Sequence, residues 1–283
     1  MAFSHLRSKA FNHGRSLSFP SKPHPSTSQF DEKIFIIRGS EASCSSLSSM
    51  NNRLNGLKNL YTNIDDLLLL PHIQQIISQE GDNKWVDQLL DGYISLLDAC
   101  TTAKDLVSHT KHDVQGLLFA LRRKDLNGIH CYLTSRKKSK KMIQKSLKNL
   151  RSFTSKQNVL ALDKDEQTLA LMYMLKEAES VTITMFEFLL SYVTASKAQA
   201  RQSRWSLVSK MMRNKKVSYE RDLNEFEKID DFLQMSIEEV QVEELMPHLK
   251  EMESSIQNLE EGFECLFRKL IRTKVFLLNI LNH

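Results

Sequence analysis

The most conspicuous chemistry in the sequence is a basic stretch, RKKSKKMIQKSLKNLR, at residues 136–151. Eight of its sixteen residues are Lys or Arg and none is acidic, whereas the whole chain carries a net charge of only +5. By composition, such a segment can bind nucleic acid, anionic lipid or an acidic protein surface. The candidate basic surface consists of Arg136, Lys137, Lys138, Lys140, Lys141, Lys145, Lys148 and Arg151.

Residues that could carry catalysis or hold a metal do not form a recognisable set. The sequence has no Gly-rich phosphate loop, no GxSxG elbow, no HExxH pair and no Cys with plausible His partners. His109 and His112 lie one helical turn apart and could supply two metal ligands, but no third accompanies them, and solvated histidines are the simpler interpretation. We therefore expect a protein that is not an enzyme, with no catalytic residue, cofactor or metal.

A second basic segment, KAQARQSRWSLVSKMMRNKK, covers residues 197–216. Its candidate amphipathic part is formed by Arg204, Trp205, Val208, Met211 and Met212, and the four apolar residues share one helical face. Basic, Trp-anchored helices of this kind can lie on a membrane surface or enter the groove of a calcium sensor. A helix that caps one end of its own bundle is the favoured interpretation, because amphipathic faces are commonly core.

The elements that must position these residues are helices, because apolar residues recur at alternating spacings of four and three. The predicted helices run from Leu47 to Pro71, from Lys84 to about Lys124, from Asn127 to Ser152, from Asp163 to Val193 and from Leu245 to Ile280, the last with a bend at Pro247. Short polar connections favour antiparallel neighbours. We predict an all-α, elongated antiparallel bundle of four to five long helices at residues 46–283; an intermolecular coiled coil is the rival arrangement.

On the predicted helix 127–152, apolar and small residues form one stripe, which leaves the basic residues on the outer face. The stripe consists of Tyr132, Ser135, Ser139, Met142, Ile143, Ser146 and Leu150. Residues 104–151 hold thirteen basic and three acidic residues, whereas residues 217–263 hold three basic and fourteen acidic ones. We expect these oppositely charged parts to be neighbours, with helix 127–152 against the acidic stretch before Phe263.

The first 45 residues differ in composition from the rest of the chain. They are rich in Ser, Lys and Arg, contain no acid before Asp31, and include Pro20, Pro23 and Pro25. We predict a disordered basic tail at residues 1–45, with an organelle transit peptide as the alternative. Widely spaced cysteines and the lack of a run of about 18 apolar residues favour an intracellular protein, cytoplasmic or peripheral at a membrane, with a plastid location as the alternative.

Several segments together resemble one family. They are RSLSFPSKPHP, DDLLLLPHIQQ, KWVDQLLDGYISLLDACTTAKD, LTSRKKSKKMIQKSLKNL and RWSLVSKMM, which span nearly the whole chain. In this order they resemble the plant-specific BYPASS-like family of helical proteins, long catalogued as a domain of unknown function. The resemblance implies a role in root and shoot development and supplies no active site.

Two functions of different class remain open. The first, which we prefer, is a non-enzymatic regulatory or adaptor protein that binds other proteins through a long helical surface. The second is a peripheral membrane protein whose basic helices bind anionic lipid. Sequence-specific nucleic-acid binding is disfavoured, because no zinc module, helix-turn-helix signature or aromatic platform accompanies the charge.

The tail also predicts one specific partner. Arg15, Ser18 and Pro20 fit the R-S-x-S-x-P pattern that 14-3-3 proteins recognise when the second serine is phosphorylated. A peptide spanning residues 11–24 with phosphate on Ser18 should bind a 14-3-3 protein with an affinity of about 8 kcal/mol, in the micromolar range, by calorimetry. The unphosphorylated peptide is the control, and equal binding of both peptides would remove this partner.

Overall fold

The computed structural model describes residues 25–39, 46–80, 84–155, 166–194, 224–234 and 239–282, and all regular structure in these ranges is helical. The helices are α1 (Pro25–Gly39), α2 (Leu47–Leu68), α3 (Pro71–Gln79), α4 (Lys84–Arg123), α5 (Leu126–Ser155), α6 (Glu166–Val193), α8 (Glu225–Gln234) and α9 (Glu239–Leu281). The predicted all-α class is confirmed.

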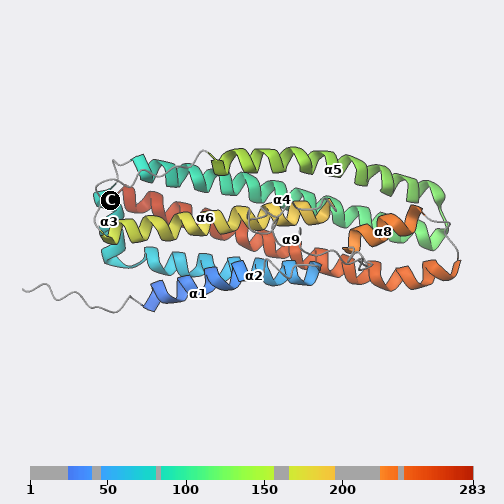
Figure 1. Cartoon of the computed structure of the whole chain (residues 1–283), viewed down its shortest axis with the longest axis horizontal. Helices are drawn as coiled ribbons and strands as arrows, with labels where there is room; N and C mark the ends of the chain where they lie inside the picture. The colour runs from blue at the N-terminus through green and yellow to red at the C-terminus, as the bar shows by residue number, and fades with distance from the viewer. Residues whose placement is uncertain are drawn as a thin grey trace, which may run out of the picture.

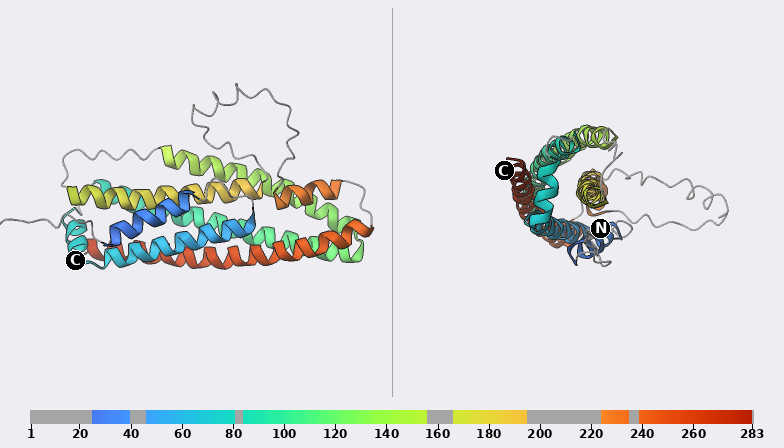
Figure 2. Two further views of the ribbon diagram at one scale, coloured as in Figure 1. Left: turned by 60° about the horizontal axis from the view of Figure 1, so that its bottom comes forward. Right: turned by 90° about the vertical axis from the view of Figure 1, so that its left-hand side faces the viewer.

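Five helices lie side by side in a curved layer, and α6 lies within the curve (Figures 1 and 2). The order across the layer is α1, α2, α9, α4 and α5, as the packed pairs of helices show. Helix α6 contacts α1, α2, α4 and α5, so it fills the concave side of the layer. The result is an elongated bundle with α9 in the middle of its convex face.

Contacts between side chains give the direction of each helix. Lys111 of α4 binds Gln257 of α9 (Nζ to Oε1, 2.9 Å), and Gln115 binds Glu253 (Nε2 to Oε1, 2.8 Å), so α4 and α9 are antiparallel. Asn51 and Asp65 of α2 meet Ser255 and Thr273 of α9, so α2 and α9 are parallel. These two helices are not consecutive in the chain, and the argument from short connections does not apply to them.

The core consists of the stripes that the four-and-three spacing predicts. On α9 the buried positions are Leu249, Met252, Ile256, Leu259, Phe263, Leu266, Leu270, Thr273 and Leu277, and the two ends of the predicted stripe, Leu245 and Ile280, are partly buried. Helix α6 differs, because no residue from Met174 to Thr194 is exposed on any side. Its half-buried residues lie mostly on one side, so other helices must cover the remaining sides, and the curved layer supplies them.

Polar groups occur inside this core with defined partners. The Tyr61 and Thr182 hydroxyls lie 3.0 Å apart, and the Thr182 hydroxyl also donates to the carbonyl of Ala178 (2.7 Å), the residue one turn earlier on α6. Burial raises the pKa of Tyr61 well above its usual value. Glu179 is buried and pairs with Lys176 (3.0 Å). A Cβ at position 92 would lie 2.7 Å from the Glu179 carboxylate, so Gly92 of α4 leaves the room for this charge.

The predicted disordered tail is wrong where it includes helix α1. Residues 25–39 were included in the disordered segment 1–45, but they form a helix whose Phe30, Ile34 and Ile37 are buried against α2 and α6. The Ser-, Lys- and Arg-rich composition of residues 1–45 as a whole hid the apolar spacing of four and three at Phe30, Ile34 and Ile37, which supports a helix. Residues 1–24 and 40–45 lie outside the described ranges, and with them the motif at Arg15, Ser18 and Pro20.

Several boundaries also differ from the prediction. The chain ends α2 before Pro71 and starts α3 with that proline at its first turn, where a missing N–H costs nothing. Helix α5 extends to Ser155, and α9 begins at Glu239 with Pro247 inside it. Helix α8 was not predicted at all.

The buried stripe of α9 gives a stability prediction. Leu259 and Leu266 are 1% and 0% exposed, so replacing either with Ala should lower the free energy of unfolding by about 2 to 5 kcal/mol through lost contacts and an unfilled cavity. Denaturant unfolding of each variant measures this loss. Tyr173→Ala, at a side chain that is 67% exposed, is the control and should change little. Unchanged stability of both Leu variants would place α9 outside the core.

Candidate functional site

The basic stretch divides into an outer face and an inner anchor. Five of its basic side chains are exposed: Lys137, Lys138, Lys141, Lys145 and Lys148, which we call the α5 lysine face. Lys140 is half-buried, and Arg136 is only 3% exposed. The prediction that Arg136 belongs to a basic surface is therefore wrong, and the side chain of Arg151 lies outside the described set.

The inner stripe of α5 is shifted from the predicted one. Tyr132, Ser139 and Ile143 are buried as expected, together with Leu147, whereas Met142 is 56% exposed. Arg136 occupies the turn between Tyr132 and Ser139, where the prediction placed Ser135. The hydrophobicity of the residues could not indicate this phase, because a guanidinium takes a core position only when a partner for it is present.

The partner of Arg136 comes from α8. Its Nε lies 3.4 Å from Asp230 Oδ1, and its Nη1 donates to the carbonyl oxygen of Val193 at 2.6 Å. The guanidinium carbon lies 4.6 Å from the ring centroid of Phe226, a cation–π contact. Lys140 adds a second cation to Asp230, with its Nζ 2.8 Å from Oδ2. This Arg136 cluster joins α5, the end of α6 and α8.

Helix α8 has a start signal that the sequence analysis missed. Asn224 Oδ1 accepts the N–H of Glu227 (2.8 Å), and Glu227 Oε2 accepts the N–H of Asn224 (3.0 Å), which is a capping box. The amide of Asn224 also donates to the carbonyl of Tyr192 (3.0 Å) and ties this start to the end of α6. Together with buried Phe226, Ile229 and Leu233, the pattern N-x-x-E was sufficient to predict the helix.

The oppositely charged parts of the chain do meet, and both α4 and α5 take part. Lys104 and Lys111 of α4 pair with Glu264 and Glu260 of α9, and these hydrogen bonds lower the pKa of both carboxyls. Helix α4 lies between α5 and α9 (Figure 2), so the expected packing of the basic helix along the acidic one does not occur. Within the acidic residues 217–263, α5 pairs with Asp230 of α8, so the expected contact occurs there and not along α9.

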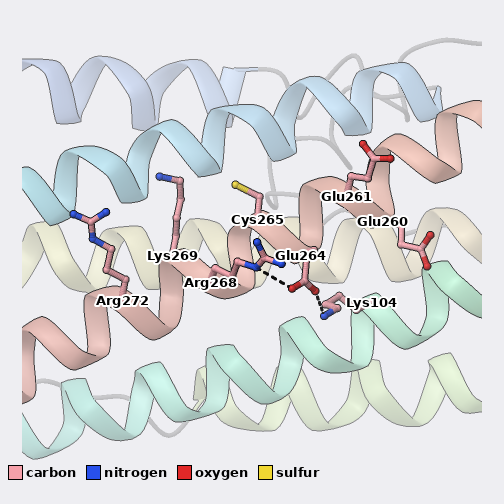
Figure 3. A pocket seen from close by; sticks show the side chains of 8 residues that line it. All are labelled: Lys104, Glu260, Glu261, Glu264, Cys265, Arg268, Lys269 and Arg272. Carbon is pink, nitrogen blue, oxygen red and sulfur yellow. Dashed lines mark hydrogen bonds and ion pairs between the residues drawn. The ribbon is translucent and has the colours of Figure 1, made fainter.

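A shallow hollow of about 660 Å³ lies on the outer side of α9. Its lining changes from acidic to basic along the helix (Figure 3): Glu260, Glu261 and Glu264, then Cys265, then Arg268, Lys269 and Arg272, with Lys104 from α4. Arg268 Nε donates to Glu264 (3.1 Å), and Lys269 Nζ donates to Thr62 of α2 (2.7 Å). Such a mixed, open surface suits a protein contact better than a small molecule, which needs an enclosed and mostly apolar pocket.

A family model described as Protein BPS1 matches residues 53–280. The chain belongs to the BPS1 family. This membership confirms the resemblance to BYPASS-like proteins and indicates a regulatory protein related to development, with no biochemical activity assigned. Neither the curated proteins nor the solved structures gave a match.

The BPS1 match covers the α5 lysine face, the Arg136 cluster and the outer side of α9, and it leaves out α1. His109 lies 3.1 Å from Ser135 Oγ and 3.7 Å from Asp113. Among the described residues no group of three or more His, Cys, Asp or Glu could hold a metal. No described helix has a stretch apolar enough to span a bilayer. Arg204, Trp205, Val208, Met211 and Met212 lie outside the described ranges.

The Arg136 cluster should hold α8 in place. Asp230→Ala removes the carboxylate from a buried guanidinium, so we expect a loss of about 3 to 5 kcal/mol in the stability of α8 docking. Hydrogen exchange of peptides covering residues 224–234, measured by mass spectrometry, should accelerate accordingly. Lys140→Ala is the matched control with a small effect, because its side chain is 35% exposed. Equal exchange in both variants would remove the ion pair as the anchor.

Proposed function

We propose that this protein is a non-enzymatic adaptor of plant development, which acts through protein–protein contacts and binds an acidic segment of its partner on the α5 lysine face. The observation that carries the proposal is the exposure of five lysines on one helix. The structure pairs none of the five with an acid among the described residues. Their charge therefore remains available to a partner.

The α5 lysine face lowers the stability of α5 when no partner is bound. Lys137, Lys141 and Lys145 follow one another at a spacing of four, and like charges at this spacing destabilise a helix by about 0.2 to 0.5 kcal/mol per pair. A partner with carboxylates at matching intervals reverses the sign of this contribution. From Lys137 to Lys148 the face is about 16 Å long at about 1.5 Å per residue, which matches about three turns of an acidic helix.

An apolar contact can accompany the charges. Met142 is 56% exposed and lies between Lys138, Lys141 and Lys145 on the same side of α5. Methionine adapts its shape to different apolar groups and is frequent at surfaces that bind several partners. The expected partner segment is therefore acidic with at least one apolar side chain.

A second candidate function, a peripheral membrane protein, is favoured by the turn between α4 and α5. Phe119 and Leu126 are 61% and 73% exposed there, next to Arg122 and Arg123. Apolar side chains beside arginines can enter the interface of an anionic bilayer. This turn and the α5 lysine face belong to one hairpin, so the two candidates share part of their surface.

The α5 lysine face gives a direct test of the adaptor function. Replacing its five lysines with Gln should abolish the capture of partner proteins from plant tissue by tagged full-length protein, compared by quantitative mass spectrometry. The matched control carries Gln at five other lysines: Lys33, Lys58, Lys84, Lys228 and Lys250. Partners that the control retains and the α5 variant loses support the proposal; equal loss in both, or no loss in either, contradicts it.

Vesicle flotation separates the second candidate from the first. Full-length protein is mixed with phosphatidylcholine vesicles with and without phosphatidylserine, over a series of salt concentrations. Binding that needs phosphatidylserine, fades with salt and is lost in Phe119→Ser/Leu126→Ser supports the membrane function. No flotation at low salt contradicts it and leaves the adaptor function untouched.

A further inference from the structure

The outer side of α9 carries a second regular stripe, opposite its buried one. Its positions alternate in steps of four and three: Ser254, Asn258, Glu261, Cys265, Arg268, Arg272 and Val275, all exposed. Helices α2 and α4 flank α9 on either side, so this outer stripe forms the middle of the convex surface (Figures 2 and 3). A four-and-three stripe is the geometry with which one helix packs along another.

The charges on the outer side of α9 have opposite signs on the two sides of Cys265. Glu261 lies one turn before the cysteine, and Arg268 and Lys269 lie one turn after it. Two turns before Cys265 the stripe has Asn258, and two turns after it Arg272. When a second copy of α9 lies antiparallel to the first and is centred on Cys265, each acidic or amide side chain of the outer stripe therefore faces a cation of the other copy.

We propose that the partner of this surface is a second copy of the chain, with the two α9 helices antiparallel and a twofold axis at Cys265. In this register position i of one helix faces position 530 − i of the other. Glu261 then faces Lys269 of the second copy with Arg268 beside it, and Asn258 faces Arg272. Val275 faces Ser255, a small residue that permits close approach. Each pair occurs twice, as a twofold interface requires.

Two of the cations that the register uses also bind within their own chain. Half-buried Lys269 donates from Nζ to Thr62 (2.7 Å), and Arg272 Nε lies 3.4 Å from Asp65 Oδ2 while 60% of the Arg272 side chain is exposed. The acidic groups differ in their accessibility. Glu260 and Glu264 are engaged by Lys111 and Lys104 of α4. Glu261 instead accepts a hydrogen bond from Gln257 on its own helix (2.7 Å) and has no ion pair with another described residue. The side chain of Arg268 is 75% exposed, although its Nε binds Glu264, so its outer nitrogens can reach a second copy.

The expected dimer is reversible. One helix stripe from Ser254 to Val275 is about 32 Å long and buries less surface than a stable obligate dimer needs. We expect a dissociation constant in the micromolar range, set mainly by the charge pairs. This surface is separate from the α5 lysine face, so the dimer and the adaptor function can succeed or fail independently.

The first test uses the exposed thiols of the chain. Cys131 and Cys265 are both free and exposed, and Cys100 is buried. In full-length protein with Cys44→Ser, diamide takes up two electrons and two protons as two thiols join. A Cys265–Cys265 disulfide should form at least about tenfold faster than a Cys131–Cys131 disulfide, because only the former pair is held together. Equal rates, or a preference for Cys131, overturn the proposal.

The second test reverses charges and restores them. Sedimentation of full-length protein over a concentration series gives the dissociation constant. Glu261→Lys alone and Arg268→Glu/Lys269→Glu alone should each raise it about tenfold or more, because each places like charges opposite one another. The triple variant should return toward the original value, and Glu32→Lys on α1 is the control. Three outcomes contradict this register: the original protein sediments as a monomer at every concentration, Glu261→Lys leaves the dissociation constant unchanged, or the triple variant keeps the raised dissociation constant.

Discussion

The rest of the structure depends on the position of α6 inside the curved layer. From Met174 to Val193 no residue of this helix is fully exposed, and its half-buried residues, such as Glu177 and Ser180, lie mostly on one side. Neighbours must therefore cover the rest of its circumference. The layer of α1, α2, α9, α4 and α5 supplies these neighbours by curving around it. Helix α1 is needed for this closure, since α6 packs against it directly, and the short α8 continues the cover at the end of α6.

This enclosure also decides which buried polar groups the fold tolerates. Glu179 enters the core because Lys176 is one turn away and Gly92 has no side chain at the point of closest approach. Arg53 is 3% exposed and lies 4.7 Å from the Phe188 ring centroid. Asp65 receives a hydrogen bond from Thr273 (2.7 Å), while burial raises its pKa. Polar contacts of this kind fix the register of helices whose apolar stripes are otherwise similar.

The sequence was sufficient to predict what depends on local periodicity. The extents of α2, α4, α5 and α6 follow from apolar spacing within a few residues, as does the buried stripe of α9. It was insufficient where the deciding partner is distant. Arg136 looks like a surface residue until Asp230 and Phe226, about ninety residues later, are placed beside it. The charge imbalance predicted that opposite halves meet, but composition cannot distinguish α4 from α5 as the helix that meets α9.

The order of helices in the layer also explains why the α5 lysine face has no acidic partner among the described residues. Four cations of the basic half, Lys104, Lys111, Arg136 and Lys140, are paired with acids of α8 and α9. The α5 lysine face is not paired in this way, and α5 is the last helix of the layer on its side (Figure 2). Within the layer, α4 is neutralised by acids of the helix next to it. By the same physics, a helix placed beside the lysines of α5 should be acidic, and within the described part of the chain only α8 supplies an acid to α5, at Arg136 and Lys140. A partner that binds the lysines would therefore extend the layer by one more helix, using the charge pairing that already joins α4 to α9.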